Sequence, residues 1–237
     1  MNRDASERLD LYITPEHPCG YIDGRMARTV FVDPDLDMDN RLYSLLASHG
    51  FRRNGPNVYK PHCAACKACV PLRIPVAEFT PDRGQLRVWK RNRDLRISVL
   101  DAVSDPVHFA LYKRYLEARH PGGGMDSSGE PEYAHFLMNP WGRTRMVAMQ
   151  GRQGLAAVAV MDELDDALSA VYTFFDPAMA RRSLGTYAIL WQIEAARRRG
   201  LRWLYLGYWI AESRKMAYKD RFRPYERLGA DGWQRSA

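Results

Sequence analysis

Hydrophobic and polar positions follow helical and strand periods in turn along the first hundred residues. Residues 37–50 have an acidic start, leucines at helical spacing and a terminal glycine, which predict a helix. Residues 51–61 predict two short strands around an Asn-Gly-Pro-Asn turn, and residues 71–79 alternate as a strand does. The charged stretch 85–100 passes from a basic helix or turn into a strand. The first part of the chain therefore mixes helices with short strands.

The second part of the chain has longer and more regular elements. A helix over 106–120 is followed by a Gly-, Ser- and Pro-rich loop and by a short helix near 132–141. The pattern then predicts three antiparallel strands, a strong helix, a buried strand, a final helix and a polar tail. Their ranges are 145–150, 155–164, 168–177, 180–200, 201–210 and 212–222.

The strand, turn, helix, strand order over residues 171–210 is typical of acyltransferases of the GCN5-related (GNAT) type. We therefore expect an α/β (α+β), GNAT-like fold with two GNAT-like halves, divided into domains 10–100 and 101–230. In that fold a glycine-rich turn at a helix start binds the pyrophosphate of coenzyme A. The corresponding turn here is 182–187, and the bulk of Tyr187 stands where a small residue is needed. The scaffold fits an acyltransferase, but the coenzyme A signature is incomplete.

Composition adds a preference for polyanions. The chain has 237 residues, 35 Lys and Arg against 28 Asp and Glu, and a formal charge of +7, which draws a domain toward nucleic acid. Basic residues gather around Trp89 at Arg87, Lys90 and Arg91, where phosphate binding and a solvated helix face are both open. No apolar run reaches the roughly 20 residues of a membrane helix. The polar, acidic start resembles no signal or transit peptide, so we expect a cytoplasmic protein.

The four cysteines are the strongest candidates for metal ligands. Cys63, Cys66 and Cys69 are spaced as zinc or iron–sulfur ligands are, but Arg73 stands where a fourth ferredoxin cysteine is expected. Cys19 or His62 would have to complete the set. We expect no obligatory cofactor, with zinc or an iron–sulfur cluster at these cysteines, or reduced structural thiols, as the alternatives.

Four ordered motifs resemble one known family. They are His-Pro-Cys-Gly-Tyr at 17–21, Gly-Phe-Arg-Arg at 50–53 leading to the cysteines, Ser-Ala-Val-Tyr-Thr-Phe-Phe at 169–175 with Ser-Leu-Gly-Thr at 183–186, and the aromatic strand 203–210 with Met216, Tyr218 and Lys219. Together they resemble the aminoacyl-tRNA–protein transferases of the N-degron pathway, and most closely the leucyl branch. Ile22 replaces a cysteine that the arginyl members carry, which favours the leucyl branch and puts their metal site in doubt here.

The resemblance implies transfer of leucine from Leu-tRNA to the α-amine of proteins that begin with Asp or Glu, with no membrane or DNA as partner. Arg119 or Lys219 would bind the acceptor carboxylate. Tyr172, Tyr208 and His120 are candidates for catalysis, together with Tyr218. Donor-binding candidates are Phe174, Phe175 and Leu206 for the leucyl side chain, and Arg182, Ser183, Gly185, Thr186, Arg87, Lys90 and Arg91 for the tRNA.

Three other functions stay open at this point. An arginyl donor would leave the mechanism unchanged. An acetyl-coenzyme A-dependent acetyltransferase would have to bind coenzyme A despite Tyr187. A zinc-stabilised RNA-binding protein would bind RNA without transferring an acyl group. The sequence has no G-x-S-x-G motif and no nucleophile triad, so nothing in it supports an acyl-enzyme intermediate.

Overall fold

One large sheet organises the molecule. The computed structural model describes residues 9–119 and 129–236, and eight strands form this sheet in the order β14-β13-β7-β12-β11-β10-β9-β8. Their bounds are β7 Val70–Pro75, β8 Arg96–Asp101, β9 Thr144–Gly151, β10 Gly154–Glu163, β11 Ala167–Phe175, β12 Trp203–Trp209, β13 Glu226–Gly229 and β14 Gly232–Arg235. Only β11 and β12 are parallel neighbours within it.

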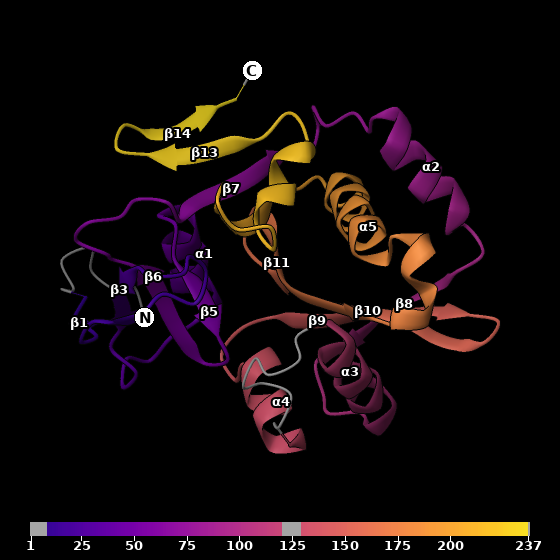
Figure 1. The fold of residues 1–237 in the computed structure, drawn as a ribbon, viewed down its shortest axis with the longest axis horizontal. Helices are drawn as coiled ribbons and strands as arrows, with labels where there is room; N and C mark the ends of the chain where they lie inside the picture. The colour runs from indigo at the N-terminus through magenta and orange to yellow at the C-terminus, as the bar shows by residue number, and fades with distance from the viewer. Residues whose placement is uncertain (1–8, 120–128, 237) are drawn as a thin grey trace.

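Helices cover both faces of the sheet. In Figure 1, α2 (Arg83–Arg91) and α5 (Leu184–Arg198) lie on one face, and α3 (Pro106–Arg119) and α4 (Glu130–Leu137) lie on the other. The central strand β10 is apolar on both sides because it is covered twice. Ala157 and Ala159 face the α5 layer, whereas Val158 and Val160 face α3 and α4. The expected mixed α/β fold is confirmed.

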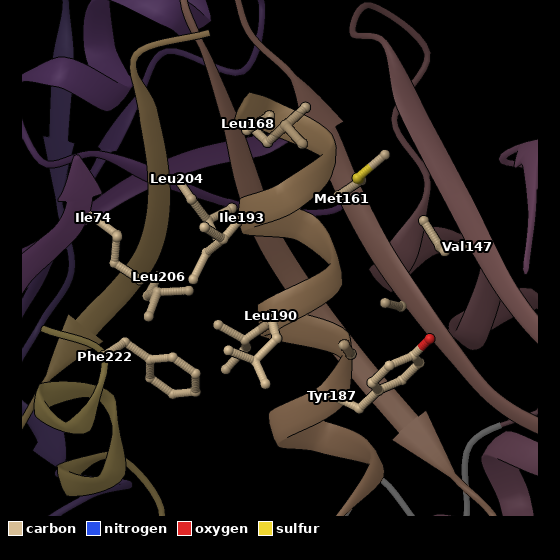
Figure 2. Close-up of a cluster of buried hydrophobic side chains, with 14 of the residues drawn as sticks. Ile74, Val147, Met161, Leu168, Tyr187, Leu190, Ile193, Leu204, Leu206 and Phe222 are labelled. Carbon is tan, nitrogen blue, oxygen red and sulfur yellow. The ribbon is translucent and has the colours of Figure 1, made fainter. Parts of the chain in front are cut away.

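The α5 layer is the larger core. Figure 2 shows Leu190 and Ile193 of α5 beside Leu204 and Leu206 of β12, with Phe222 closing the cluster. Burial of each such side chain is worth about 1.5–3 kcal/mol. The apolar face of α5, which repeats every 3.6 residues, therefore packs on the sheet and fixes the position of the helix start.

A smaller sheet packs beside the large one. Its strands, in the order β1-β4-β6-β5, are Leu11–Ile13, Thr29–Val32, Asn57–Pro61 and Arg52–Asn54. The chain also forms a two-stranded pair, β2 (His17–Pro18) with β3 (Met26–Ala27), and the helix α1 (Asn40–Ser48). The helix begins where the Asp39 carboxylate accepts a hydrogen bond from the Leu42 amide at 2.7 Å. The expected helix near 37–50 and hairpin over 51–61 are both confirmed.

The C-terminal segment differs from the expectation. The helix expected over 212–222 is wrong: only a 3₁₀ turn, η2 (Ala217–Arg221), forms there. Its polar groups bond to β12 instead of to a continued helix, with the Ala217 carbonyl accepting from Trp209 and Lys219 donating to the Tyr208 carbonyl. The polar tail, for which we expected no element, forms β13 and β14, anchored by the Trp233 indole on the Ser48 carbonyl.

Both halves of the chain supply strands to the large sheet. β7 and all but the last residue of β8 come from residues 10–100, and the remaining six strands come from beyond residue 101. The division into domains 10–100 and 101–230 stays a prediction. Within the described ranges, no helix is both long and apolar enough to cross a membrane.

Candidate active site

The parallel strands β11 and β12 separate where the candidate site begins. They pair only between residues 167–169 and residues 203–205, although β11 runs on to Phe175 and β12 to Trp209. The free parts of these strands, together with η2 and the start of α5, therefore surround one region of the molecule. Open ends of parallel strands are a common ligand position in α/β folds because their backbone groups remain available.

An aromatic group lines the β11 side of this region. The Tyr115 ring of α3 lies 5.0 Å from that of Phe175 and 6.3 Å from that of Tyr172, and Arg119 stacks over Phe175 at 5.8 Å. Burial raises the pKa of Tyr172 well above its ordinary value, so its hydroxyl stays protonated at neutral pH. The structure thus brings together Tyr172, Phe175 and Arg119, all of them candidates from the sequence.

The start of α5 meets the same aromatic group. A side chain at Gly185 would lie 3.7 Å from the Phe175 ring, so the first turn of α5 and β11 are in contact. Ser183 takes the left-handed conformation (φ 54°) just before the helix, and Thr186 lies in its first turn. Three of the donor-binding candidates therefore gather at a helix N-terminus, where amides favour an anion.

The turn before α5 is fastened to α2. The Arg182 guanidinium donates to Asn92 and Asp94, and Arg91 donates to the Arg181 carbonyl. Tyr187 is buried against Trp89 with a ring separation of 5.5 Å. Tyr187 thus joins α5 to α2, and Arg182 already has a carboxylate partner.

Basic side chains are exposed on the outer face of α2. Arg87, Lys90 and Arg91 are exposed on this helix, beside exposed Arg181 of the turn before α5. By contrast, Arg197 donates to the Val76 and Phe79 carbonyls and holds that segment to α5. The α2 surface is the part of the molecule that suits a phosphate backbone next to the α5 start.

Two buried cations face each other on the β12 side. Lys219 of η2 and Arg52 of β5 are 7% and 6% exposed. A side chain built on Gly207 would lie 3.7 Å from the Lys219 Nζ and 3.8 Å from the Arg52 Nε, so both nitrogens approach one point. Gly207 takes φ +75° at a bulge in β12, a conformation that favours glycine.

A positive charge is energetically unfavourable at this point. Burial, with the neighbouring Arg52 charge acting in the same direction, lowers the pKa of Lys219 to about 7. The Lys219 Nζ donates to the Tyr208 carbonyl at 2.6 Å and contacts the Met216 sulfur at 3.6 Å. Lys219, a candidate from the sequence, is thus a lysine whose charge would be favoured by an added anion.

Other candidates from the sequence lie elsewhere or have structural contacts. The Tyr208 hydroxyl donates to the Gly50 carbonyl at 2.8 Å, and Phe174 is fully buried between the Tyr112 and Tyr133 rings. Leu206 belongs to the α5 core. His120 lies outside the described residues.

The cysteines border the Arg52 side of the region. Cys19, Cys63, Cys66 and Cys69 are half-buried and free of disulfides. Desolvation, with the other three thiols nearby, raises the pKa of Cys69 to about 12, whereas an amide hydrogen bond and Arg25 lower that of Cys66. In the described part of the chain, no three Cys, His, Asp or Glu side chains are placed to hold a metal ion. A zinc ion or an iron–sulfur cluster at these cysteines stays a prediction.

Sequence reasoning missed Arg52, although the Gly-Phe-Arg-Arg motif contains it. Successive residues of a strand point to opposite sides, so Arg52 and Arg53 cannot share one partner. Arg53 pairs with Asp162, whereas Arg52 points toward Gly207 and stacks on Tyr205 at 4.9 Å. Two adjacent arginines in a short predicted strand were the available signal.

Comparisons with known proteins identify the family. Models described as the N terminus and the C terminus of arginine-tRNA-protein transferase match residues 17–87 and 107–229. A protein of Hahella chejuensis named aspartate/glutamate leucyltransferase is 48% identical over 225 residues, which is 95% of this chain and 96% of that protein. One of Stenotrophomonas maltophilia with the same name is 50% identical, covering 98% and 95%.

A solved structure, that of L-PGS from Bacillus licheniformis, aligns with a TM-score of 0.46 at 11% identity, covering 70% of this chain and 49% of that one. The sequence matches confirm the resemblance carried by the four motifs and the enzyme class that it implied, an aminoacyltransferase. The chain belongs to the arginine-tRNA-protein transferase family, among its aspartate/glutamate leucyltransferases.

Proposed function

We propose that the protein transfers leucine from Leu-tRNA to the α-amine of polypeptides that begin with Asp or Glu, in the cytoplasm, and so marks them for degradation. The observation that carries the proposal is the buried lysine at the open end of β12. Lys219 has no carboxylate partner among the described residues, and its position suits an acceptor that brings its own. The family names of the near-full-length relatives support the same donor and acceptor.

The reaction needs little chemical help. The leucyl ester is already activated, so no ATP is consumed. The neutral α-amine attacks the ester carbonyl, a C–N bond forms, and the ester C–O bond breaks. The tRNA hydroxyl leaves and takes up a proton, and the amine loses one. Because an α-amine has a pKa of about 7.7–8.0, a substantial fraction is neutral near neutral pH. Binding in register supplies much of the remaining acceleration.

The donor end lies against the aromatic group and the start of α5. Phe175 and Tyr115 form an apolar surface for the leucyl side chain, whereas Phe174 belongs to the core. Amides near Gly185 and Thr186, with the Ser183 hydroxyl, suit the terminal phosphate and ribose groups. The basic α2 surface then accompanies the tRNA stem. Tyr172 is the best-placed catalytic candidate because its ring lies in this group, whereas the Tyr208 hydroxyl is engaged.

The acceptor end lies toward Lys219. Its ammonium would bind the Asp or Glu carboxylate and would gain charge stability from it. Arg119, exposed above Phe175, is the alternative cation on the other side of the region. A single carboxylate recognised at one fixed cation explains selection of acidic N-termini over neutral ones.

The test is a transfer assay with separately charged tRNAs. Radiolabelled Leu-tRNA and Arg-tRNA are each mixed with the protein and peptides that begin with Asp, Glu, Asn or Lys. The proposal requires label to move from Leu-tRNA to the Asp and Glu peptides alone. Label from Arg-tRNA would keep the mechanism and replace the donor. Acetylation from acetyl-coenzyme A without any aminoacyl transfer would overturn the proposal.

A further inference from the structure

Arg52 carries a buried charge that nothing around it neutralises. Its Nε and both Nη atoms are inaccessible and have no hydrogen-bond partner. No carboxylate of the described residues lies within ion-pair distance of it, and its guanidinium stacks on the face of the Tyr205 ring. Five unused N–H donors on a buried guanidinium are costly in free energy. A folded chain that retains this cost favours an anion as the missing partner.

The neighbouring titratable groups cannot supply that anion. Tyr43, Tyr59 and Tyr208 lie near enough to feel the Arg52 charge, but burial raises each of their pKa values far above neutrality. Cys69, on the Lys219 side, has its pKa raised to about 12. All four are therefore uncharged at neutral pH, and Lys219 adds a second cation.

Arg53, the next residue of the same strand, has the carboxylate partner that Arg52 lacks. Its Nε and Nη2 donate to the two Asp162 carboxylate oxygens at 2.7 and 2.8 Å, and Nη2 also reaches the Leu137 carbonyl. Asp162 is thereby engaged at both oxygens and also accepts from Thr144. Among the described residues, Asp162 is the only buried carboxylate, and it is paired with Arg53. The Arg52 guanidinium therefore keeps its donors unused.

We propose that Arg52 is the residue that determines acceptor specificity, and that it binds the carboxylate of an N-terminal Asp or Glu together with Lys219. The proposal rests on the transfer reaction proposed above. Gly207 is partly exposed, and both cations approach the position that a side chain on it would occupy. A guanidinium fork accepts a carboxylate in two places, and Lys219 adds a third donor. An Asn or Gln acceptor would leave both charges buried without compensation.

The experiment measures kcat/KM for leucine transfer to matched peptides that begin with Asp or Asn. Wild type is compared with Arg52→Gln, which removes the charge, and with Arg52→Lys, which restores it. Arg202→Gln changes an exposed arginine and serves as the control. We expect the Asp/Asn ratio to fall by about 10- to 100-fold in Arg52→Gln, mainly through KM for the Asp peptide. Arg52→Lys should recover part of the ratio, and Arg202→Gln should equal wild type.

Thermal melting separates specificity from folding. Because Arg52→Gln removes an uncompensated buried charge, its Tm should equal or exceed that of wild type. If the variant fails to fold, melting of wild type with an Asp-Ala or Asn-Ala dipeptide gives the answer, since only Asp-Ala should raise the Tm.

The outcomes distinguish the two proposals. If the wild type transfers leucine to Asp peptides and Arg52→Gln keeps the full Asp/Asn ratio of kcat/KM, the proposed role of Arg52 is overturned and the proposed function is not. The same holds if Arg119→Gln, and not Arg52→Gln, abolishes the ratio. If the wild type transfers leucine to no peptide, the proposed function itself is overturned.

Discussion

Arg53 and Asp162 form a two-point ion pair that joins the small sheet to the large one. The Nε–Oδ2 and Nη2–Oδ1 distances are 2.7 and 2.8 Å, and both side chains are essentially inaccessible. Arg53 lies on β5 and Asp162 on β10, just after a bulge between Val160 and Met161. The pair therefore fixes where Arg52, one residue away, can point.

Loss of one partner should destabilise the fold strongly. Asp162→Asn leaves the Arg53 charge buried without compensation, and we expect a loss of about 3–5 kcal/mol in the free energy of unfolding. Urea unfolding measures it. The exposed pair Arg202–Asp166 provides the matched control, since Asp166→Asn should cost less than about 1 kcal/mol. Equal losses for the two variants would show that the buried pair does not join the sheets.

Stability should depend on pH through Lys219. Its pKa is about 7 in the folded protein and 10.5 when unperturbed. Between these values the unfolded chain holds one more proton than the folded one, so the stability contributed by this residue rises as pH increases from about 7 to 10. Urea midpoints for wild type and Lys219→Met across that range should differ in slope, and the variant should lack this rise. Lys215→Met, at an exposed position, should retain the wild-type slope.

The periodic elements were predictable from sequence, and the reason is local. Residues such as Ile189, Ile193 and Ala196 repeat at 3.6-residue spacing, and all three are buried on α5. The helix expected over 212–222 does not form because hydrogen bonds from Lys219 and Trp209 to other parts of the fold override its helical composition. β13 and β14 likewise depend on tertiary contacts that the local sequence does not reveal.

The site was predictable only in part. Tyr172, Phe175, Gly185 and Lys219 stand in the recognised motifs, and the structure gathers them around the ends of β11 and β12. The difference between Arg52 and Arg53 depends on a residue 109 positions away, Asp162. No local pattern encodes such a partner.

The basic surface of α2 should bind the tRNA backbone. Arg87→Gln and Lys90→Gln each remove an exposed cation, and each should reduce the slope of log affinity against log salt by about 1. Fluorescence anisotropy with uncharged tRNA at several salt concentrations measures the slope. Arg202→Gln should leave it unchanged. An unaltered slope in both α2 variants would move the tRNA to another face.

The tip of the β5–β6 hairpin should not tolerate a side chain. The Gly55 amide donates to the Phe136 carbonyl at 2.9 Å, and an added Cβ would lie 2.1 Å from the His135 carbonyl oxygen. Gly55→Ala should therefore lower the Tm more than Gly24→Ala. Gly24 shares a positive φ (+72° against +58°) but has open space around it. A similar Tm for the two variants would mean that the hairpin does not dock closely on α4.

The chemical identity of the reaction product decides whether the protein is a leucyltransferase. An Asp-starting peptide is incubated with the protein and Leu-tRNA, and the product is sequenced by tandem mass spectrometry. We predict one added leucine, joined by a peptide bond to the α-amine of the Asp, and no product from the matched Asn peptide. Unmodified Asp peptide, or leucine attached elsewhere than the α-amine, would contradict it.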